Sequence, residues 1–138
     1  MEALIHRVRG KNPLVHCITN YVTAGDCANM LLACGGSPIM ADDLAEAAAI
    51  TAGCDALVLN LGTPHAGTLP AMAAAGKQAN QLGHPVVLDP VGVGASPWRL
   101  RRTQELLHLW TPSILRVNLG EAQALLAMNS REQGVDSP

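Results

Sequence analysis

Short apolar runs alternate with longer amphipathic stretches along the chain, and this alternation constrains the fold more than any other feature. Several runs are apolar at consecutive positions, which is typical of strands buried on both faces of a sheet. Strands separated by helices of ten or more residues indicate repeated β-α-β units with right-handed crossovers. The sequence therefore predicts a three-layer α/β/α fold with a mostly parallel sheet. The expected strands are 14–18, 37–40, 56–60, 85–89 and 113–117.

Helix boundaries are marked by residues with strong capping preferences. Thr63-Pro64 and Ser96-Pro97 each place a cap before a proline at the first helical position. Asp43-Leu-Ala-Glu46 has the spacing of a capping box, and Gly35-Gly36 and Gly83 are typical helix ends. We expect helices over about 22–34, 43–51, 64–82 and 97–110.

Composition narrows the classes of function. The chain has 138 residues, a formal charge of −2 and 49% hydrophobic residues, which excludes a disordered chain and fits one domain. Lys and Arg are not in surplus, so no nucleic acid or membrane is expected as a partner, and no apolar run approaches the ~20 residues of a membrane span. The N-terminus lacks the apolar core of a secretory leader, and the four cysteines form no Cys-x-x-Cys pair. We expect a cytoplasmic protein with reduced thiols.

Polar residues or glycines follow each expected strand. Ligands of parallel α/β sheets bind outside the carboxyl ends of the strands, so these residues are candidates for a site. Asp89 and Glu121 supply two carboxylates that suit a hydrated magnesium ion, and the guanidinium of Arg116 matches phosphate oxygens. The glycines at 92 and 94 would let backbone amides approach an anion. Together these features favour phosphoryl transfer.

Each of these residues also has a structural interpretation. Asn118-Leu-Gly-Glu121 fits a helix N-cap with glutamate at the third helical position. Asp89-Pro90 could be a turn that ends a strand, and Asn20 could cap the next helix. Met40 at a strand end could belong to the core. The functional interpretation depends on the joint arrangement.

Five segments resemble the hydroxyethylthiazole kinase family in order and spacing, from about residue 8 to Asp136. They are Pro13-Leu-Val-His-Cys-Ile-Thr-Asn20, Ala28-Asn-Met-Leu-Leu32, Ser37-Pro-Ile-Met-Ala41, Leu57-Val-Leu-Asn-Leu-Gly-Thr63 and Leu88-Asp-Pro-Val-Gly-Val-Gly-Ala95. The resemblance implies a ribokinase-like fold and transfer of the γ-phosphoryl group of ATP, with Mg²⁺, to 4-methyl-5-(2-hydroxyethyl)thiazole in thiamine biosynthesis and salvage. It also implies a homotrimer with active sites at subunit interfaces.

The resemblance implies roles for individual positions. Met40, Asn20 and Gly62 match positions at the thiazole pocket, Asn20 near the neighbouring subunit. Arg116 matches an ATP-binding arginine. Asp89 and Glu121 match acidic residues associated with magnesium and phosphate. The sequence departs from the family in two places: Val117 replaces a glycine of the Arg-Gly-Asn segment, and Gly120 replaces a bulkier residue. A β-branched residue at 117 restricts the backbone of a loop that should approach phosphate.

Family members are about twice as long as this chain. Their second half carries the remaining ATP contacts and a Gly-x-Gly-Cys segment whose cysteine is implicated at the transferring phosphoryl group. The resemblance therefore implies that residues 1–138 are the N-terminal part of one truncated kinase domain, and that no residue present here is the catalytic one. Two alternatives stay open: an inactive remnant, and another ribokinase-like kinase, for example one acting on hydroxymethylpyrimidine. The matches at Met40 and Thr19-Asn20 argue against the latter.

Overall fold

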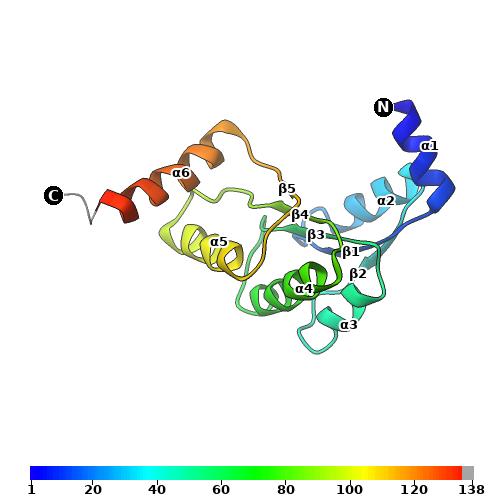
Figure 1. The fold of residues 1–138 in the computed structure, drawn as a ribbon, viewed down its shortest axis with the longest axis horizontal. Coiled ribbons are helices and arrows are strands. Elements are labelled where there is room, and N and C mark those ends of the chain that lie inside the picture. Colours follow the sequence, from blue (N-terminus) through cyan, green and yellow to red (C-terminus); the bar gives the residue numbers. More distant parts are fainter. Residues whose placement is uncertain (135–138) are drawn as a thin grey trace.

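A computed structural model, which describes residues 1–134, contains one sheet of five parallel strands in the order β2-β1-β3-β4-β5 (Figure 1). The strands are β1 (Leu14–Ile18), β2 (Ser37–Met40), β3 (Ala56–Asn60), β4 (Val86–Asp89) and β5 (Ile114–Leu115). The helices are α1 (Glu2–Lys11), α2 (Ala24–Cys34), α3 (Ala47–Ala52), α4 (Thr68–Leu82), α5 (Pro97–Leu109) and α6 (Leu119–Gly134). The expected three-layer α/β/α class is confirmed, and every pair of neighbouring strands is parallel.

The strand order reverses direction between β1 and β3. The chain runs outward from β1 to β2, then crosses back over β1 to place β3 on its other side. Beyond β3 the strands follow one another to β5. In an open parallel sheet such a reversal leaves a crevice at the carboxyl ends of the two strands. The topology therefore predicts a ligand site at the residues that follow β1 and β3.

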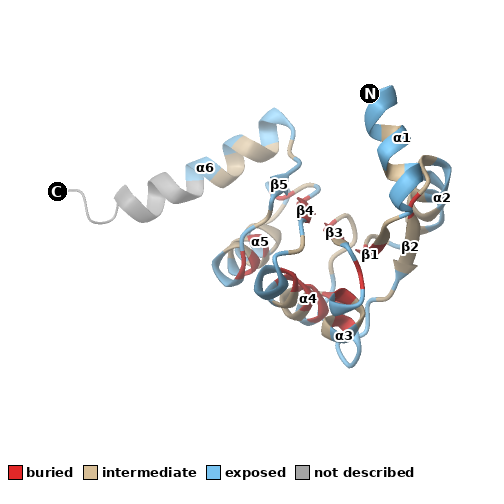
Figure 2. Ribbon diagram, turned by 45° about the vertical axis from the view of Figure 1, so that its right-hand side comes forward, coloured by how far each residue is buried: buried red, intermediate tan, exposed pale blue. Residues whose placement is uncertain are grey.

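The main core lies between the sheet and the helices α3, α4 and α5. Figure 2 shows these three helices on one side of the strands. Alternate residues of β3 and β4 point into this layer, so Leu57, Leu59, Val86 and Leu88 are fully buried. α4 meets them with alanines at four-residue spacing, which allows the helix to approach the sheet closely. These alanines are Ala71, Ala75 and Ala79.

The opposite side of the sheet is covered chiefly near β2. Figure 2 shows α1 and α2 there, while α6 leads away from the sheet beyond β5 (Figure 1). Val58 and Val87, which face this side, are only half-buried, and both residues of the edge strand β5 are exposed. Within residues 1–134 no helix is both long and apolar enough to cross a membrane.

The apolar pattern predicts the first three strands with the bounds that the structure shows. The fourth begins at Val86, one residue later than expected, and the fifth is shortened to Ile114–Leu115. β5 is an edge strand whose only partner among the described strands is β4, and β4 itself ends at Asp89. Pairing along one side of a short strand limits the length of β5.

Three expected helix boundaries are confirmed. The Ser96 hydroxyl accepts a hydrogen bond from the Arg99 amide at 3.1 Å, and Pro97 occupies the first turn of α5. Gly35 and Gly83 end α2 and α4 with φ of 96° and 70°, a conformation that favours glycine.

Two expected helix starts are wrong, and in both the capping oxygen has another partner. The Asp43 carboxylate accepts from the Ala45 amide at 2.8 Å, which forms a turn, so α3 begins only at Ala47. The Thr63 hydroxyl accepts from the Tyr21 amide at 3.2 Å and therefore holds the loop after β1. α4 begins at Thr68 instead.

Candidate functional site

Four polar side chains lie at the carboxyl edge of the sheet. Asn20 follows β1, Asn60 and Asp89 are the last residues of β3 and β4, and Arg116 follows β5 directly. The β3–β4 register places Asn60 opposite Asp89. The parallel topology thus brings together residues that are far apart in the sequence, and Asn20 and Asn60 meet at the reversal of strand order.

These four side chains form one hydrogen-bonded line. Asn20 Nδ2 donates to Asn60 Oδ1 at 2.9 Å, and Asn60 Nδ2 donates to Asp89 Oδ2 at 3.3 Å. Arg116 Nη1 donates to the same Asp89 oxygen at 2.9 Å. Asn20, Asn60 and Asp89 are partly buried, with the Asp89 side chain 13% exposed, whereas the Arg116 side chain is 75% exposed, so the line ends at the surface. Of the predicted site residues, Asn20, Asp89 and Arg116 are joined through Asn60.

Gly62 packs directly against Asn20. A Cβ at Gly62 would lie 2.9 Å from both Cβ and Nδ2 of Asn20, closer than real Cβ contacts come. The Gly62 amide also donates to Asn60 Oδ1 at 2.9 Å. The Asn20 oxygen accepts from the Thr23 amide and hydroxyl at 2.9 and 3.0 Å, next to the start of α2. Asn20 therefore supports the entry of α2 and reaches across to β3 as well.

Met40 lies at the same edge but outside the hydrogen-bonded line. It ends β2, pairs in register with Cys17 of β1, and is 40% exposed. The carbonyl of the next residue, Ala41, bonds His16 Nε2 at 2.7 Å, while His16 Nδ1 bonds the Thr51 hydroxyl at 2.8 Å. This fully buried histidine fixes the strand end that carries Met40, and its burial lowers its pKa.

Glu121 lies in the first turn of α6 and uses both carboxylate oxygens. Oε2 accepts from the Asn118 amide at 2.9 Å while Asn118 Oδ1 accepts from the Glu121 amide at 2.8 Å, which is a reciprocal cap. Oε1 accepts from the Gly92 amide at 3.0 Å. The structural interpretation of this segment is therefore confirmed. The same side chain also holds the loop after β4, residues 91–95, here called the glycine loop.

The two carboxylates suit a hydrated Mg²⁺ better than a closed metal cage. Both hydrogen bonds to Asp89 use Oδ2, so Oδ1 is the oxygen suited to a metal. No cluster of three or more His, Cys, Asp or Glu that could hold a metal occurs among the described residues. Mg²⁺ commonly binds through one or two carboxylates together with waters and phosphate oxygens. Asp89 Oδ1 fits that kind of site, whereas both Glu121 oxygens already accept hydrogen bonds from backbone amides.

The two buried cysteines, Cys17 and Cys54, do not supply a reactive thiolate. All four cysteines are free. Burial raises the pKa of Cys17 to about 11 and also raises the pKa of Cys54. These two thiols are therefore neutral near pH 7 and act as small core side chains.

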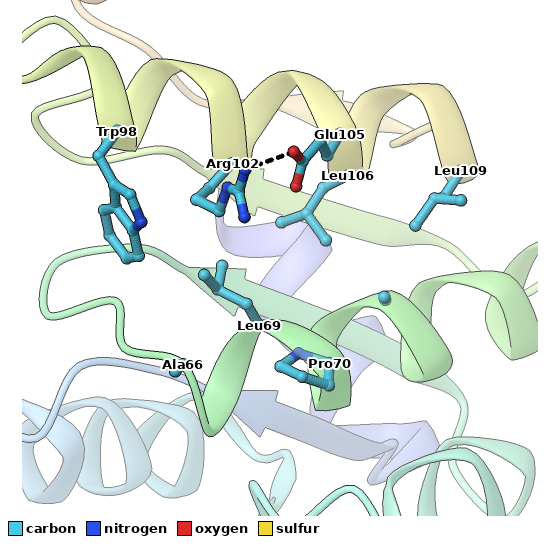
Figure 3. Close-up of a pocket in the computed structure, with 9 residues that line it drawn as sticks. Ala66, Leu69, Pro70, Trp98, Arg102, Glu105, Leu106 and Leu109 are labelled. Carbon is cyan, nitrogen blue, oxygen red and sulfur yellow. Dashed lines mark hydrogen bonds and ion pairs between the residues drawn. The ribbon is translucent and has the colours of Figure 1, made fainter.

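An apolar groove lies on the outer side of the helical layer, between α4 and α5 (Figure 3). Trp98 and Leu109 from α5 face Leu69 from α4 across it, and the Arg102–Glu105 ion pair lies on its α5 side. Its volume is about 350 Å³. None of the predicted site residues lines this groove.

Two residues that matter at the strand ends were not assigned a role from the sequence. Asn60 joins Asn20 to Asp89 in the hydrogen-bonded line. A polar residue at the end of an apolar strand is a sequence pattern that could have indicated this role. Arg99 lies in the first turn of α5 and donates to backbone carbonyls of two strand-end loops. No local pattern indicates such contacts, because they depend on how α5 packs.

Comparison with known proteins identifies the family of the chain. The model of the hydroxyethylthiazole kinase family matches residues 5–138. A hydroxyethylthiazole kinase of Clostridium beijerinckii is 53% identical over 135 residues, which are 98% of this chain and 49% of the relative. That of Clostridium acetobutylicum is 50% identical over 137 residues, 99% of this chain and 50% of the relative.

A solved structure of a hydroxyethylthiazole kinase protein from Pyrococcus horikoshii has the same fold. It matches with a TM-score of 0.88 and 41% identity, over 98% of this chain and 54% of that chain. The chain thus spans about half the length of the curated relatives it matches. Because the family model matches nearly every residue, the chain belongs to the hydroxyethylthiazole kinase family.

Proposed function

We propose that this chain forms the thiazole side and part of the nucleotide side of a hydroxyethylthiazole kinase. The reaction is transfer of the γ-phosphoryl group of ATP to the hydroxyl of 4-methyl-5-(2-hydroxyethyl)thiazole, in thiamine biosynthesis and salvage. The hydrogen-bonded line from Asn20 through Asn60 and Asp89 to Arg116 carries the proposal. It connects the proposed acceptor side to the proposed phosphate side across the crevice of the sheet.

On the acceptor side, Asn20, Gly62 and Met40 would contact the thiazole. Gly62 leaves room for the Asn20 side chain, and Asn60 fixes the orientation of the Asn20 amide. The half-exposed thioether of Met40, one strand away, suits an apolar, sulfur-containing ring.

On the phosphate side, Arg116 would bind ATP. The Arg116 side chain is 75% exposed although its partner Asp89 is only 13% exposed, so the guanidinium is accessible to a phosphate from solvent. Mg²⁺ bound with ATP would neutralise phosphate charge in the transition state. Asp89 and Glu121 would hold that ion, and Glu121 keeps the Gly92 loop in place.

A second candidate function is binding without efficient turnover by these 138 residues alone. The chain spans about half of its relatives, and neither buried cysteine provides a thiolate. The family resemblance places a catalytic cysteine outside this sequence. Loss of preorganised donors to developing charge costs several powers of ten in rate.

We also propose a cytoplasmic homotrimer in which a neighbouring subunit approaches Asn20, as the resemblance implies, with residues 1–138 as the N-terminal part of a single domain. Tyr21 and Val22, next to Asn20, are 78% and 72% exposed. Apolar side chains exposed beside a site are typical of contact surfaces. Light scattering coupled to size-exclusion chromatography measures the assembly, and a stable monomer that binds thiazole would contradict it.

Separate titrations test the two sides of the proposed site. The purified chain is titrated with the thiazole alcohol and with Mg-ADP by calorimetry. Asn20→Ser is expected to weaken thiazole binding at least about tenfold and to leave nucleotide binding intact, whereas Arg116→Gln should do the reverse, since each loses a contact worth ~1.4 kcal/mol or more. The control is Arg101→Gln, an exposed residue of α5.

A wild-type chain that binds neither ligand would refute the proposed site. A phosphorylation assay then separates the two candidate functions. Turnover near the ~1–100 s⁻¹ of ordinary kinases would reject the second candidate, and binding without such turnover would support it.

A further inference from the structure

One side chain of α5, Arg99, joins the loops that follow β3 and β4. Its Nη1 donates to the carbonyl oxygens of Leu61 at 2.9 Å and Val91 at 3.0 Å, and its Nη2 donates to that of Gly62 at 3.2 Å. Leu61 and Gly62 belong to the turn beside Asn20, and Val91 begins the glycine loop. The guanidinium is therefore a bridge between the proposed acceptor and phosphate sides.

The peptide group between Val91 and Gly92 is held at both of its ends. Its carbonyl oxygen accepts from Arg99, and its N–H donates to the Glu121 carboxylate at 3.0 Å. A cation at the oxygen and an anion at the N–H fix the direction of the peptide dipole. Gly92 has φ of 64°, and a Cβ there would lie 3.7 Å from Arg99 Nη1. The arginine thus lies directly against the residue whose backbone makes the turn.

The backbone of Arg99 is itself fixed in the first turn of α5. Its amide donates to the capping hydroxyl of Ser96 at 3.1 Å, and its carbonyl accepts from the Thr103 hydroxyl at 2.9 Å. The side chain is half-buried. A planar guanidinium with donors on two nitrogens can reach three carbonyls in one geometry, which a single ammonium group reproduces poorly.

We propose that Arg99 is a positioning residue that locks the glycine loop against the turn after β3 and so sets the spacing between thiazole and phosphate. It touches only backbone groups of these loops in the described contacts, so it acts through them. The effect on ligand binding rests on the proposed kinase function, whereas the effect on the loops does not.

Hydrogen-exchange mass spectrometry on the 138-residue chain tests the effect on the loops. In Arg99→Gln we expect the amides of 61–62 and 91–95 to exchange at least about tenfold faster than in wild type, since a tenfold change corresponds to ~1.4 kcal/mol. The central strands β1 and β3 should keep their protection. Exchange in Arg99→Lys should be faster than in wild type and slower than in Arg99→Gln, and exchange in the control Arg101→Gln should match wild type. Unchanged exchange of both loops in Arg99→Gln would overturn the proposal.

Titration of the same variants with the thiazole alcohol and with Mg-ADP tests the consequence for binding. Arg99→Gln should weaken both ligands, unlike a variant on one side of the site, and Arg99→Lys should restore part of both affinities. Wild-type affinity for both ligands in Arg99→Gln would overturn the positioning role even if the loops loosen. If the wild-type chain binds neither ligand, the proposed function fails, and hydrogen exchange alone decides whether Arg99 locks the loops.

Discussion

Gly76 in the middle of α4 offers a sharp test of the packing between α4 and α5. It is buried, and an added Cβ would lie within 3.0 Å of three atoms of the Trp110 indole. The ring has little room to retreat, because Trp110 is only 3% exposed and its amide bonds the Leu106 carbonyl at 3.2 Å. Gly76→Ala therefore sets a gain in helix propensity against a clash in the core.

The cost of the clash is expected to exceed the gain in helix propensity, so Gly76→Ala should lower the free energy of unfolding. Replacing glycine by alanine inside a helix gains about 1 kcal/mol, while overpacking costs about 1–3 kcal/mol and a rigid buried ring places the cost near the upper value. The net loss is about 2 kcal/mol, which lowers the folding equilibrium constant about 30-fold. For a chain of this length the melting temperature should fall by about 6–10 °C.

Urea and thermal unfolding followed by circular dichroism measure this difference. Gly25→Ala is the matched control, because Gly25 is an exposed glycine of α2 and its added Cβ would meet nothing within 4 Å. It should be neutral or stabilising by up to about 1 kcal/mol. In a Trp110→Leu background the substitution at Gly76 should lose most of its cost, because the ring that it strikes is gone. A Gly76→Ala chain as stable as wild type would refute the reasoning.

Other predictions concern the buried groups and the strand-end turn. Burial holds the pKa of His16 below its ordinary value, so as the pH falls the unfolded chain takes up a proton at this residue before the folded chain does. The free energy of unfolding should therefore fall from pH 7 to pH 5, by at most ~1.4 kcal/mol per pH unit from this group. His16→Gln should be less stable at pH 7, but its free energy of unfolding in urea titrations should depend less on pH over that range. The pKa of Cys17, about 11, leaves about 0.1% thiolate at pH 8, so iodoacetamide should label it at least about tenfold more slowly than the half-exposed Cys27, and equal labelling by mass spectrometry would contradict its burial. Gly62→Ala should weaken thiazole binding about tenfold in calorimetry because the new methyl group displaces Asn20; unchanged affinity would place the ligand elsewhere.

The parts of the fold that the sequence predicts well depend on local interactions. Strands such as 56–60 follow from an apolar run between turns, and Gly83 ends α4 through its own backbone freedom. The helix starts at Asp43 and Thr63 were wrong because a capping oxygen binds whichever N–H reaches it. For Asp43 that donor is the Ala45 amide, and for Thr63 it is the amide of Tyr21, 42 residues away.

In the candidate site too, some residues can be predicted from the sequence and others depend on packing. A parallel topology puts strand-end residues on one edge whatever the packing details, so Asn20, Asp89 and Arg116 could be placed together from the sequence. Arg99 could not, because it binds carbonyl oxygens that every residue possesses, and only the docking of α5 selects which ones.

Glu121 uses its two carboxylate oxygens for two different structural contacts. One of its carboxylate oxygens caps α6 and the other holds the Gly92 amide, so the cap fixes the geometry that the loop requires. With Arg99 on the other side of the same peptide group, the consecutive helices α5 and α6 hold one turn between them. These contacts fix the glycine loop without a ligand, so under the proposed function they would reduce the entropy that phosphate binding must overcome.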